Sequence, residues 1–288
     1  MTRTRLALAL LALIALMATL AACGDDGDEA EEAATSTTEA ACVRDDLDTL
    51  EPGVLTVGTD RPAFPPYFVD DDPTNGEGFE SAVAFGIADR LGFADSQVTW
   101  VTVPFNSSYA PGPKRFDFDI NQISITPARA DQVDFSRPYY TTPQAVLVPA
   151  GSPYAGATDV AALKEARFGV QVGTTSLDAL ESVIDPSQQP QVFNDSNDTV
   201  RALKSKQVDA IVVDLPTAIY LRDVEVEGST VAGQFPAPGG DDWGVVLAKG
   251  SRLTPCVDEA IAAMDASGEL DQLADQWIGA EAPVLALE

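Results

Sequence analysis

Residues 168–214 read FGVQVGTTSLDALESVIDPSQQPQVFNDSNDTVRALKSKQVDAIVVD, a stretch in which short apolar runs alternate with segments of helical pattern. The apolar runs predict strands, because they are rich in valine, isoleucine and phenylalanine and are bounded by glycine, proline or polar residues. The expected strands are 168–172, 191–194 and 208–213, and the expected helices are 173–184 and 195–206, the second with candidate caps at Ser196 and Asp198. Strands that alternate with helices predict an α/β fold, in which helices flank mostly parallel sheets.

The same alternation continues outward on both sides of this stretch. A helix is expected at 79–91, because its apolar residues follow a helical spacing that stops at Gly92. The other expected elements are strands at 54–58, 98–103 and 243–247, an extended stretch at 116–125, and two helices within 253–278. A chain of 288 residues with 45% apolar residues is long enough for one large domain or two of ordinary size.

The N-terminus has the pattern of a bacterial lipoprotein signal peptide. Two arginines precede an apolar run at 6–20, which is shorter than the roughly 20 residues that a membrane-spanning helix needs. The run ends in LAAC at 20–23, so residues 1–22 are the expected leader and Cys23 the expected lipidation site. Lipid chains anchor through about 0.8 kcal/mol per buried CH2, which predicts an extracytoplasmic protein held to the membrane by its N-terminus. Ordinary secretion with a chance cysteine is the alternative.

Residues 23–41 are expected to be a lipidated, acidic, flexible tether. Residues 24–40 contain seven acidic residues, no basic residue and no large apolar residue. Such a segment has nothing to bury that would offset the entropy of ordering it. The folded part is therefore expected to begin at residue 42.

Charge and composition exclude several classes of function. The net charge is −28, and loss of Arg3 and Arg5 with the leader would make it −28 − 2 = −30. This charge repels nucleic acid and anionic membrane surfaces, so neither is an expected partner. The chain has no histidine, which removes the Ser-His-Asp triad, Cys-His pairs and imidazole metal sites. We expect no metal and no cofactor.

The three cysteines suggest one disulfide. With Cys23 lipidated, Cys42 and Cys256 remain, and an oxidising compartment favours their pairing. The bridge would span 256 − 42 = 214 residues, which is worth roughly 5 kcal/mol in the chain-entropy model. Two free thiols are the alternative.

Five motifs, in order and with matching gaps, carry a family resemblance. They are LTVGTD at 55–60 with FPPY at 64–67, GFE at 78–80 through RLG at 90–92, SITPARA at 124–130 with VDFS at 133–136 and PYY at 138–140, GVQVGTT at 169–175, and VDA at 208–210 through Asp214. Over residues 51–280 the chain resembles the extracellular solute-binding proteins of family 3, the amino-acid-type group.

The resemblance implies a two-lobed periplasmic-binding-protein clamshell. Each lobe would be a mixed, mostly parallel sheet flanked by helices, and two crossover strands would join the lobes. The implied limits are 42–146 and 240–288 for the first lobe and 147–239 for the second. The implied function is a monomeric binding lipoprotein of an ABC importer, which captures a free amino acid and delivers it to a membrane permease.

The family's head-group contacts carry over to particular positions here. The fork of Arg129 would hold the ligand carboxylate together with the backbone N–H groups of Thr174 and Thr175. Asp214, the hydroxyl of Ser124 and the carbonyl of Gln122 would receive the ammonium. The alternatives are that Arg129 is a surface charge and that Asp214, Thr174 and Thr175 only cap helices.

The side-chain pocket is expected to favour a polar or basic amino acid. The matching family positions make Phe64 and Phe105 an aromatic pair around the ligand side chain, and Asp60 a partner for a cationic one. Gln122 and Gln171, with Asn121, make the pocket polar. Burial in the core is the alternative for the two phenylalanines, and ordering of its loop is the alternative for Asp60.

Two departures and two further functions remain open. The Pro/Gly-rich loop 107–114 replaces what is often a helix, and Asn121-Gln122 stand where small residues are common. A dehydratase-like enzyme on the same fold is one alternative function, for which Asp60, Glu80 and Asp214 are the available acid-base groups. A ligand-sensing lipoprotein that serves no channel is the other.

Overall fold

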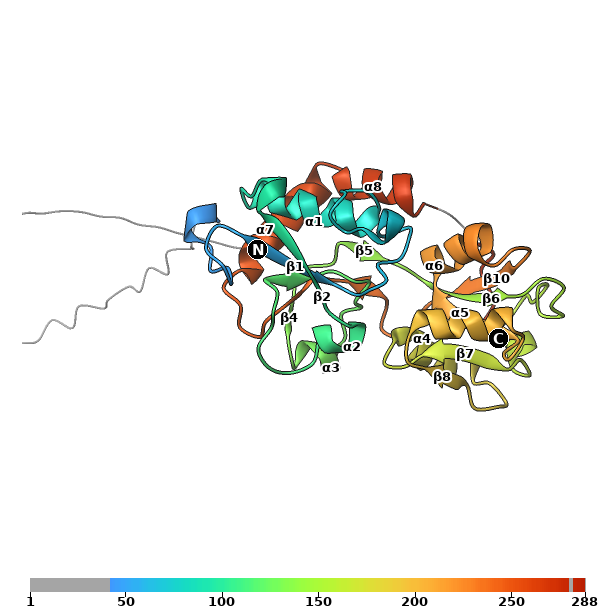
Figure 1. The fold of residues 1–288 in the computed structure, drawn as a ribbon. Coiled ribbons are helices and arrows are strands. Elements are labelled where there is room, and N and C mark those ends of the chain that lie inside the picture. The colour runs from blue at the N-terminus through green and yellow to red at the C-terminus, as the bar shows by residue number, and fades with distance from the viewer. Residues whose placement is uncertain (1–41, 280–281, 288) are drawn as a thin grey trace, which may run out of the picture. The chain divides into compact units, whose positions relative to one another are not determined.

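The computed structural model describes residues 42–279 and 282–287, which form two lobes, each built around a sheet (Figure 1). The leader at 1–22, the lipidation site Cys23 and the tether at 23–41 lie outside the described residues. A disulfide joins Cys42 to Cys256, with the Cα atoms 5.4 Å apart, which confirms the predicted pairing.

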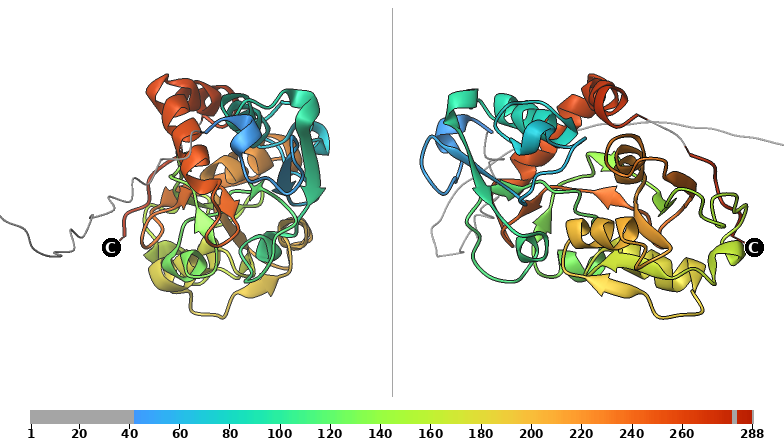
Figure 2. Two further views of the ribbon diagram at one scale, coloured as in Figure 1. Left: turned by 90° about the vertical axis from the view of Figure 1, so that its left-hand side faces the viewer. Right: turned by 45° about the vertical axis from the view of Figure 1, so that its right-hand side comes forward.

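The first lobe contains a sheet with the strand order β2-β1-β3-β12-β4. Its strands are β1 (Leu55–Thr59), β2 (Val98–Thr102), β3 (Phe118–Asp119), β4 (Asp134–Phe135) and β12 (Val246–Leu247). β1 runs parallel to β2 and β3, and β12 runs antiparallel to β3 and β4, so the sheet is mixed. Three helices pack beside one another on this lobe, α1 (Phe79–Arg90), α7 (Thr254–Ala266) and α8 (Glu269–Trp277), as both views of Figure 2 show.

The second lobe repeats this build with the strand order β10-β6-β9-β7-β8. Its strands are β6 (Gln144–Val148), β7 (Phe168–Gln171), β8 (Gln191–Phe193), β9 (Ala210–Asp214) and β10 (Thr230–Phe235). β7 is parallel to β8 and β9, and β6 is antiparallel to β9 and β10. Its helices are α4 (Thr175–Ala179), α5 (Ser196–Lys204) and α6 (Leu215–Tyr220), of which α4 and α6 continue as π-helical turns at Leu180–Ile184 and Leu221–Glu225.

Two crossover strands connect the lobes. β5 (Tyr140–Thr141) and β11 (Asp242–Trp243) pair antiparallel with each other. The ring of Trp243 is fully buried and packs against Tyr67 and Tyr140. The crossover strands are thereby packed into the hydrophobic core of the first lobe. The remaining short helices are α2 (Phe105–Ser108) and α3 (Pro127–Ala130), with 3-10 turns at Arg44–Asp46, Val69–Asp71, Asp95–Gln97 and Ala161–Leu163.

Several expected elements differ in the structure, for local reasons. The strand expected at 243–247 is split between β11 and β12, because the N–H groups of the two residues between them bond elsewhere, that of Gly244 to the Ile123 carbonyl and that of Val245 to the Ser136 hydroxyl. Of the stretch 116–125 only β3 is a strand, because the positive φ of Gln122 breaks it. Strands β6 and β10 were not expected, and the loop after Pro104 begins with the helical turn α2.

Two of the expected lobe limits also differ. The limit at residue 146 falls inside β6, which belongs to the second sheet from Gln144 onward. The last residues leave the first lobe, since the Leu285 N–H donates to the Gln234 carbonyl at 2.9 Å. The cause is the burial of an apolar side chain on the second lobe: Leu285 is 2% exposed and occupies the space over Gly233 that a Cβ would fill.

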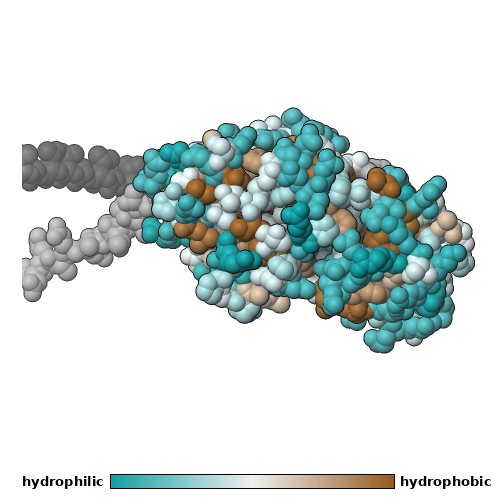
Figure 3. Space-filling view, in the orientation of Figure 1, coloured by the Kyte–Doolittle hydropathy of each residue, from teal (hydrophilic) through white to brown (hydrophobic). Residues whose placement is uncertain are grey.

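The face in Figure 3 is largely hydrophilic over the described residues, with small hydrophobic areas separated from one another, as the acidic composition leads one to expect. Within residues 42–279 and 282–287, no helix combines the length and the apolar character needed to cross a membrane. The same residues include no group of three or more acidic or cysteine side chains arranged to hold a metal ion.

Candidate ligand-binding site

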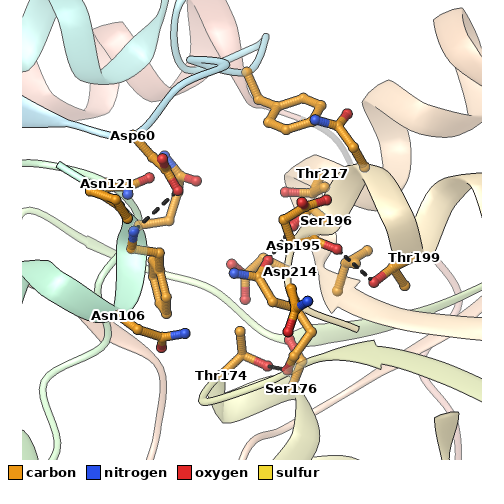
Figure 4. Close-up of a pocket in the computed structure, with 18 of the residues that line it drawn as sticks. Asp60, Asn106, Asn121, Thr174, Ser176, Asp195, Ser196, Thr199, Asp214 and Thr217 are labelled. Atoms are coloured by element: carbon orange, nitrogen blue, oxygen red, sulfur yellow. Dashed lines mark hydrogen bonds between the residues drawn. The ribbon is translucent and has the colours of Figure 1, made fainter. Parts of the chain in front are cut away.

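A cavity of about 420 Å³ lies where the two lobes face each other. Figure 4 shows Asp60, Asn106 and Asn121 on one side of it and Asp214, Thr174, Ser176 and Thr217 on the other. Apart from Arg129, all the residues expected at the ligand contribute to its walls, namely Asp60, Phe64, Phe105, Gln122, Ser124, Gln171, Thr174, Thr175 and Asp214. The topology thus brings together side chains that lie up to 154 positions apart (214 − 60).

Asp60 follows the end of β1 and stands at the first-lobe wall. Its carboxylate accepts from the backbone N–H of Arg61 at 2.7 Å and from that of Phe105 at 3.1 Å. It therefore orders the start of α2, which begins at Phe105, and it also lines the cavity. Burial raises the pKa of this carboxyl group, which makes a cationic partner favourable.

Arg129 is buried beside the cavity instead of lining it. Its side chain extends from α3, which begins at the Thr126 cap, and the residue is 7% exposed. Nη1 donates to the Ser124 carbonyl at 2.6 Å, and Nη2 donates across to the Gly173 carbonyl of the second lobe at 2.9 Å. The guanidinium carbon lies 4.5 Å from the ring centroid of Tyr109, a cation–π contact. Arg129 is thus not the surface charge of the alternative interpretation.

Thr174 and Thr175 stand where β7 gives way to α4. The side-chain oxygen of Thr174 accepts from the Leu177 N–H, so this residue does cap the helix, as the alternative had it, while also lining the cavity. Gly173 precedes it with φ +75°, a conformation that glycine adopts at no steric cost. The hydroxyl of Thr175 lies 3.2 Å from that of Ser124 in the first lobe.

Asp214 ends β9 and makes no side-chain capping bond within the described chain, which removes the helix-cap interpretation. Its carboxylate instead accepts from Gln144 Nε2 at 2.7 Å, and the same amide nitrogen donates to Asp241. Burial, followed by the charge of Asp241, raises the pKa of Asp214 well above its usual range. A cation placed against this buried carboxyl group would therefore stabilise its charged form.

Several lining residues were not predicted from the sequence. Among them are Arg61, Asn106, Asn194, Asp195, Ser196, Asn197, Thr199 and Thr217. Four of them, at 194–197, directly follow β8, and the carboxyl ends of strands were the same signal that pointed to Asp214. Asp195 was expected only as the start of a helix. It is the cap of α5, accepting from the Asp198 N–H at 2.8 Å, whereas Ser196 donates to Gln171.

The lobes touch each other directly around the cavity. The Tyr67 hydroxyl lies 2.8 Å from that of Thr217, and the Tyr109 hydroxyl donates to the Gly173 carbonyl at 3.1 Å. With the Arg129 and Thr175 contacts, these bonds hold the arrangement closed at several points.

Comparison with known proteins identifies the family. The family model of the bacterial extracellular solute-binding proteins, family 3, matches residues 55–280. The chain belongs to this family. The "L-cystine-binding protein TcyJ" of Escherichia coli (strain K12) is 30% identical over 234 residues, which cover 80% of this chain and 85% of that protein.

Solved structures of similar proteins share the two-lobed fold. "An ancestral arginine-binding protein bound to arginine" has 31% identity and a TM-score of 0.66, covering 79% of this family 3 chain and 99% of its own. The ancestral amino acid-binding protein AncCDT-1, described as a precursor of cyclohexadienyl dehydratase, has 28% identity and a TM-score of 0.65, covering 79% and 96%. The predicted α/β clamshell is confirmed.

Proposed function

We propose that this family 3 protein captures a free amino acid, polar or basic, between its lobes and delivers it to the permease of an ABC importer. The observation that carries the proposal is a pair of opposite charges at one cavity: Asp214 lines the cavity, and the charge of Arg129, which is buried beside it, lowers the pKa of that carboxyl group against the larger rise that burial causes. A zwitterion matches this pair, because its carboxylate and ammonium require a cation and an anion a few ångströms apart. Family membership and the names of TcyJ and the arginine-bound ancestral protein support an amino acid.

The proposed head-group contacts use both lobes. The ligand carboxylate takes the place of the Gly173 carbonyl at Arg129 Nη2 and accepts from Thr174 and Thr175 of the second lobe. The ammonium donates to Asp214, to the Ser124 hydroxyl and to the Gln122 carbonyl. A ligand that touches both lobes stabilises the closed arrangement over the open one, which is the requirement for capture.

The proposed side-chain subsite is polar and acidic. Phe64 and Phe105 flank it, and Gln171 adds an amide. Asp60 and Asp195 bring carboxylates from opposite lobes, which suits a guanidinium, an ammonium or another donor-rich group. A cavity of about 420 Å³ is within the usual range for small-molecule sites.

The cellular setting is proposed from the sequence and the family. The protein sits outside the cytoplasm, anchored through lipid on Cys23 and tethered by residues 23–41, and works as a monomer with ABC permease subunits. The first lobe comprises residues 42–143 and 236–279, and the second comprises 144–235 with 282–287. This division follows the strand order of the two sheets and the burial of Leu285 against the second lobe.

We favour binding over catalysis because two similar proteins, TcyJ and the arginine-bound ancestral protein, are binding proteins. Of the three candidate acid-base groups, Asp60 and Asp214 line the cavity, whereas Glu80 is fully buried, is bonded to Gln122 and Tyr139, and is not among the residues that line it.

A thermal-shift screen of the protein against the twenty amino acids, L-cystine, several amines and several sugars tests the proposal. A ligand at 100 times its Kd stabilises the fold by about 2.7 kcal/mol, a shift of several degrees. A shift with one or a few amino acids supports the function and names the ligand group. No shift with any amino acid, together with a shift from another metabolite, would overturn the substrate class. Loss of the amino acid during incubation would indicate turnover.

A further inference from the structure

A buried carboxylate behind the cavity wall, that of Glu80, accepts two hydrogen bonds from one residue of the wall, Gln122; we call this pair of bonds the two-point grip. Oε1 of Glu80 accepts from the backbone N–H of Gln122 at 2.6 Å, and Oε2 accepts from the side-chain amide of the same residue. The hydroxyl of Tyr139 also donates to Oε1. Glu80 is 0% exposed, so none of these bonds competes with bulk water.

The wall residue that Glu80 grips has an uncommon backbone. Gln122 has φ +48°, in the left-handed region that residues with a Cβ rarely occupy. It lines the cavity, and its neighbours Asn121 and Ser124 line the cavity as well. An unfavourable backbone persists where the surroundings over-determine it, and the two oxygens of one carboxylate supply that constraint here.

Glu80 itself is fixed by the helix that carries it. It is the second residue of α1, whose first free N–H groups donate to the loop before the helix: Phe79 N to the Pro66 carbonyl and Glu80 N to the Tyr67 carbonyl. Gly78 permits this close approach, with φ +102° and no room for a Cβ against the Tyr67 carbonyl. The carboxylate therefore reaches Gln122 from a rigid base.

We propose that Glu80 is a positioning residue for the ligand site: its two-point grip on Gln122 sets the cavity wall at residues 121–124, and protonating or removing its carboxylate weakens ligand binding. The inference rests on the proposed function, because it concerns affinity at the same cavity. Glu80 acts through Gln122 and does not touch the ligand.

The charge state of Glu80 changes close to neutral pH. Burial raises its pKa from 4.5 to about 7, while the bonds from Tyr139 and Gln122 lower it. The other titratable groups that face it are Tyr67 and Tyr139, whose pKa values burial raises well above 10, and Asp119 and Asp214, whose pKa values burial likewise raises. Below pH 7 the carboxyl gains a proton and loses acceptor capacity toward Gln122, so affinity should fall as pH decreases.

Stability should follow the opposite trend. Because the folded pKa lies above the unfolded one, the contribution of Glu80 to stability is present at low pH and is lost as pH rises through about 7. A merely structural role would make affinity track stability. Asp214, which lines the cavity, also has a raised pKa, so the change that is specific to positioning is the part of the pH dependence of affinity that Glu80→Gln removes and Asp119→Asn keeps.

The test compares full-length wild type with Glu80→Gln, Asp119→Asn and Tyr139→Phe. Asp119 is the matched control, since it is a 0% exposed carboxyl whose oxygens carry no hydrogen bond from the described residues. Calorimetry at pH 6, 7 and 8 uses each of the twenty amino acids and L-cystine as probes, and hydrogen exchange follows the Gln122 amide. Tyr139→Phe keeps the grip but removes a bond that lowers the Glu80 pKa, and it still tests the inference if Glu80→Gln does not fold.

The expected results are specific. Wild-type affinity should fall from pH 8 to pH 6 with a midpoint near 7. Glu80→Gln should bind about tenfold more weakly at pH 8, without that midpoint and with faster exchange at Gln122, because the left-handed backbone loses its support. Asp119→Asn should match wild type, and Tyr139→Phe should move the midpoint upward.

Unchanged affinity and pH profile in Glu80→Gln would overturn the inference while leaving the proposed function intact, and so would equal losses in Glu80→Gln and Asp119→Asn. If Glu80→Gln is unfolded, an unmoved midpoint in Tyr139→Phe overturns it. Wild type that binds none of the probes fails the proposed function itself, and the inference falls with it.

Discussion

Arg129 offers the sharpest test of the proposed head-group contacts. Replacing it by alanine removes a guanidinium that is 7% exposed and donates to carbonyls in both lobes. A ligand carboxylate would then be buried without its counter-charge, which costs about 3–5 kcal/mol. At 1.4 kcal/mol per factor of ten, affinity should fall by about 10² to 10³·⁵. Arg129→Lys keeps the charge but loses the planar fork and should fall between alanine and wild type.

The assay is titration calorimetry with the amino acid that gives the largest thermal shift in wild type. Arg137→Ala is the matched control, because Arg137 lies on the same segment and its ion pair with Asp265 is exposed. Circular dichroism of each variant confirms that it is folded, since Arg129 also bonds across the lobes. Binding by Arg129→Ala within threefold of wild type would refute the assignment of the carboxylate to this residue.

Three further changes follow from the same structure. Asp214→Asn should weaken binding of the ligand ammonium by a factor of ten or more. It should also reduce the fall in affinity that wild type shows as the pH drops below the raised pKa of Asp214. Equal pH profiles of wild type and variant in calorimetry would contradict this prediction. Cys42→Ser with Cys256→Ser should lower the free energy of unfolding by up to about 5 kcal/mol in denaturant titrations, and reducing agent should then have no further effect, unlike in wild type. Tyr109→Phe removes the hydroxyl that reaches the Gly173 carbonyl and should raise the ligand dissociation rate about 2- to 10-fold in stopped flow, whereas an unchanged rate would mean that this bond does not hold the closed arrangement.

The sequence alone determined the architecture and most of the site's members. Strand β1, helix α1 and the β7–α4–β8–α5–β9 run follow from short apolar runs and helical spacing, which are local properties of the chain. The motifs around Ser124, Arg129 and Asp214 carried the family and hence the two-lobed fold. The disulfide followed from the count of cysteines, because only one pair was left after Cys23.

Only the tertiary structure decided how these residues meet. Three contacts join segments that are far apart in the chain. Arg129 donates to the Gly173 carbonyl beside the cavity, Gln144 donates its amide to both Asp214 and Asp241, and Leu285 packs on the second lobe. The grip of Glu80 on Gln122 is of the same kind, since 42 positions separate the two residues. Local sequence patterns indicate which face of a helix or strand is apolar. The partner of a buried charge, in contrast, depends on how two elements distant in the sequence pack against each other. This packing therefore determines the pKa values and the geometry of the site.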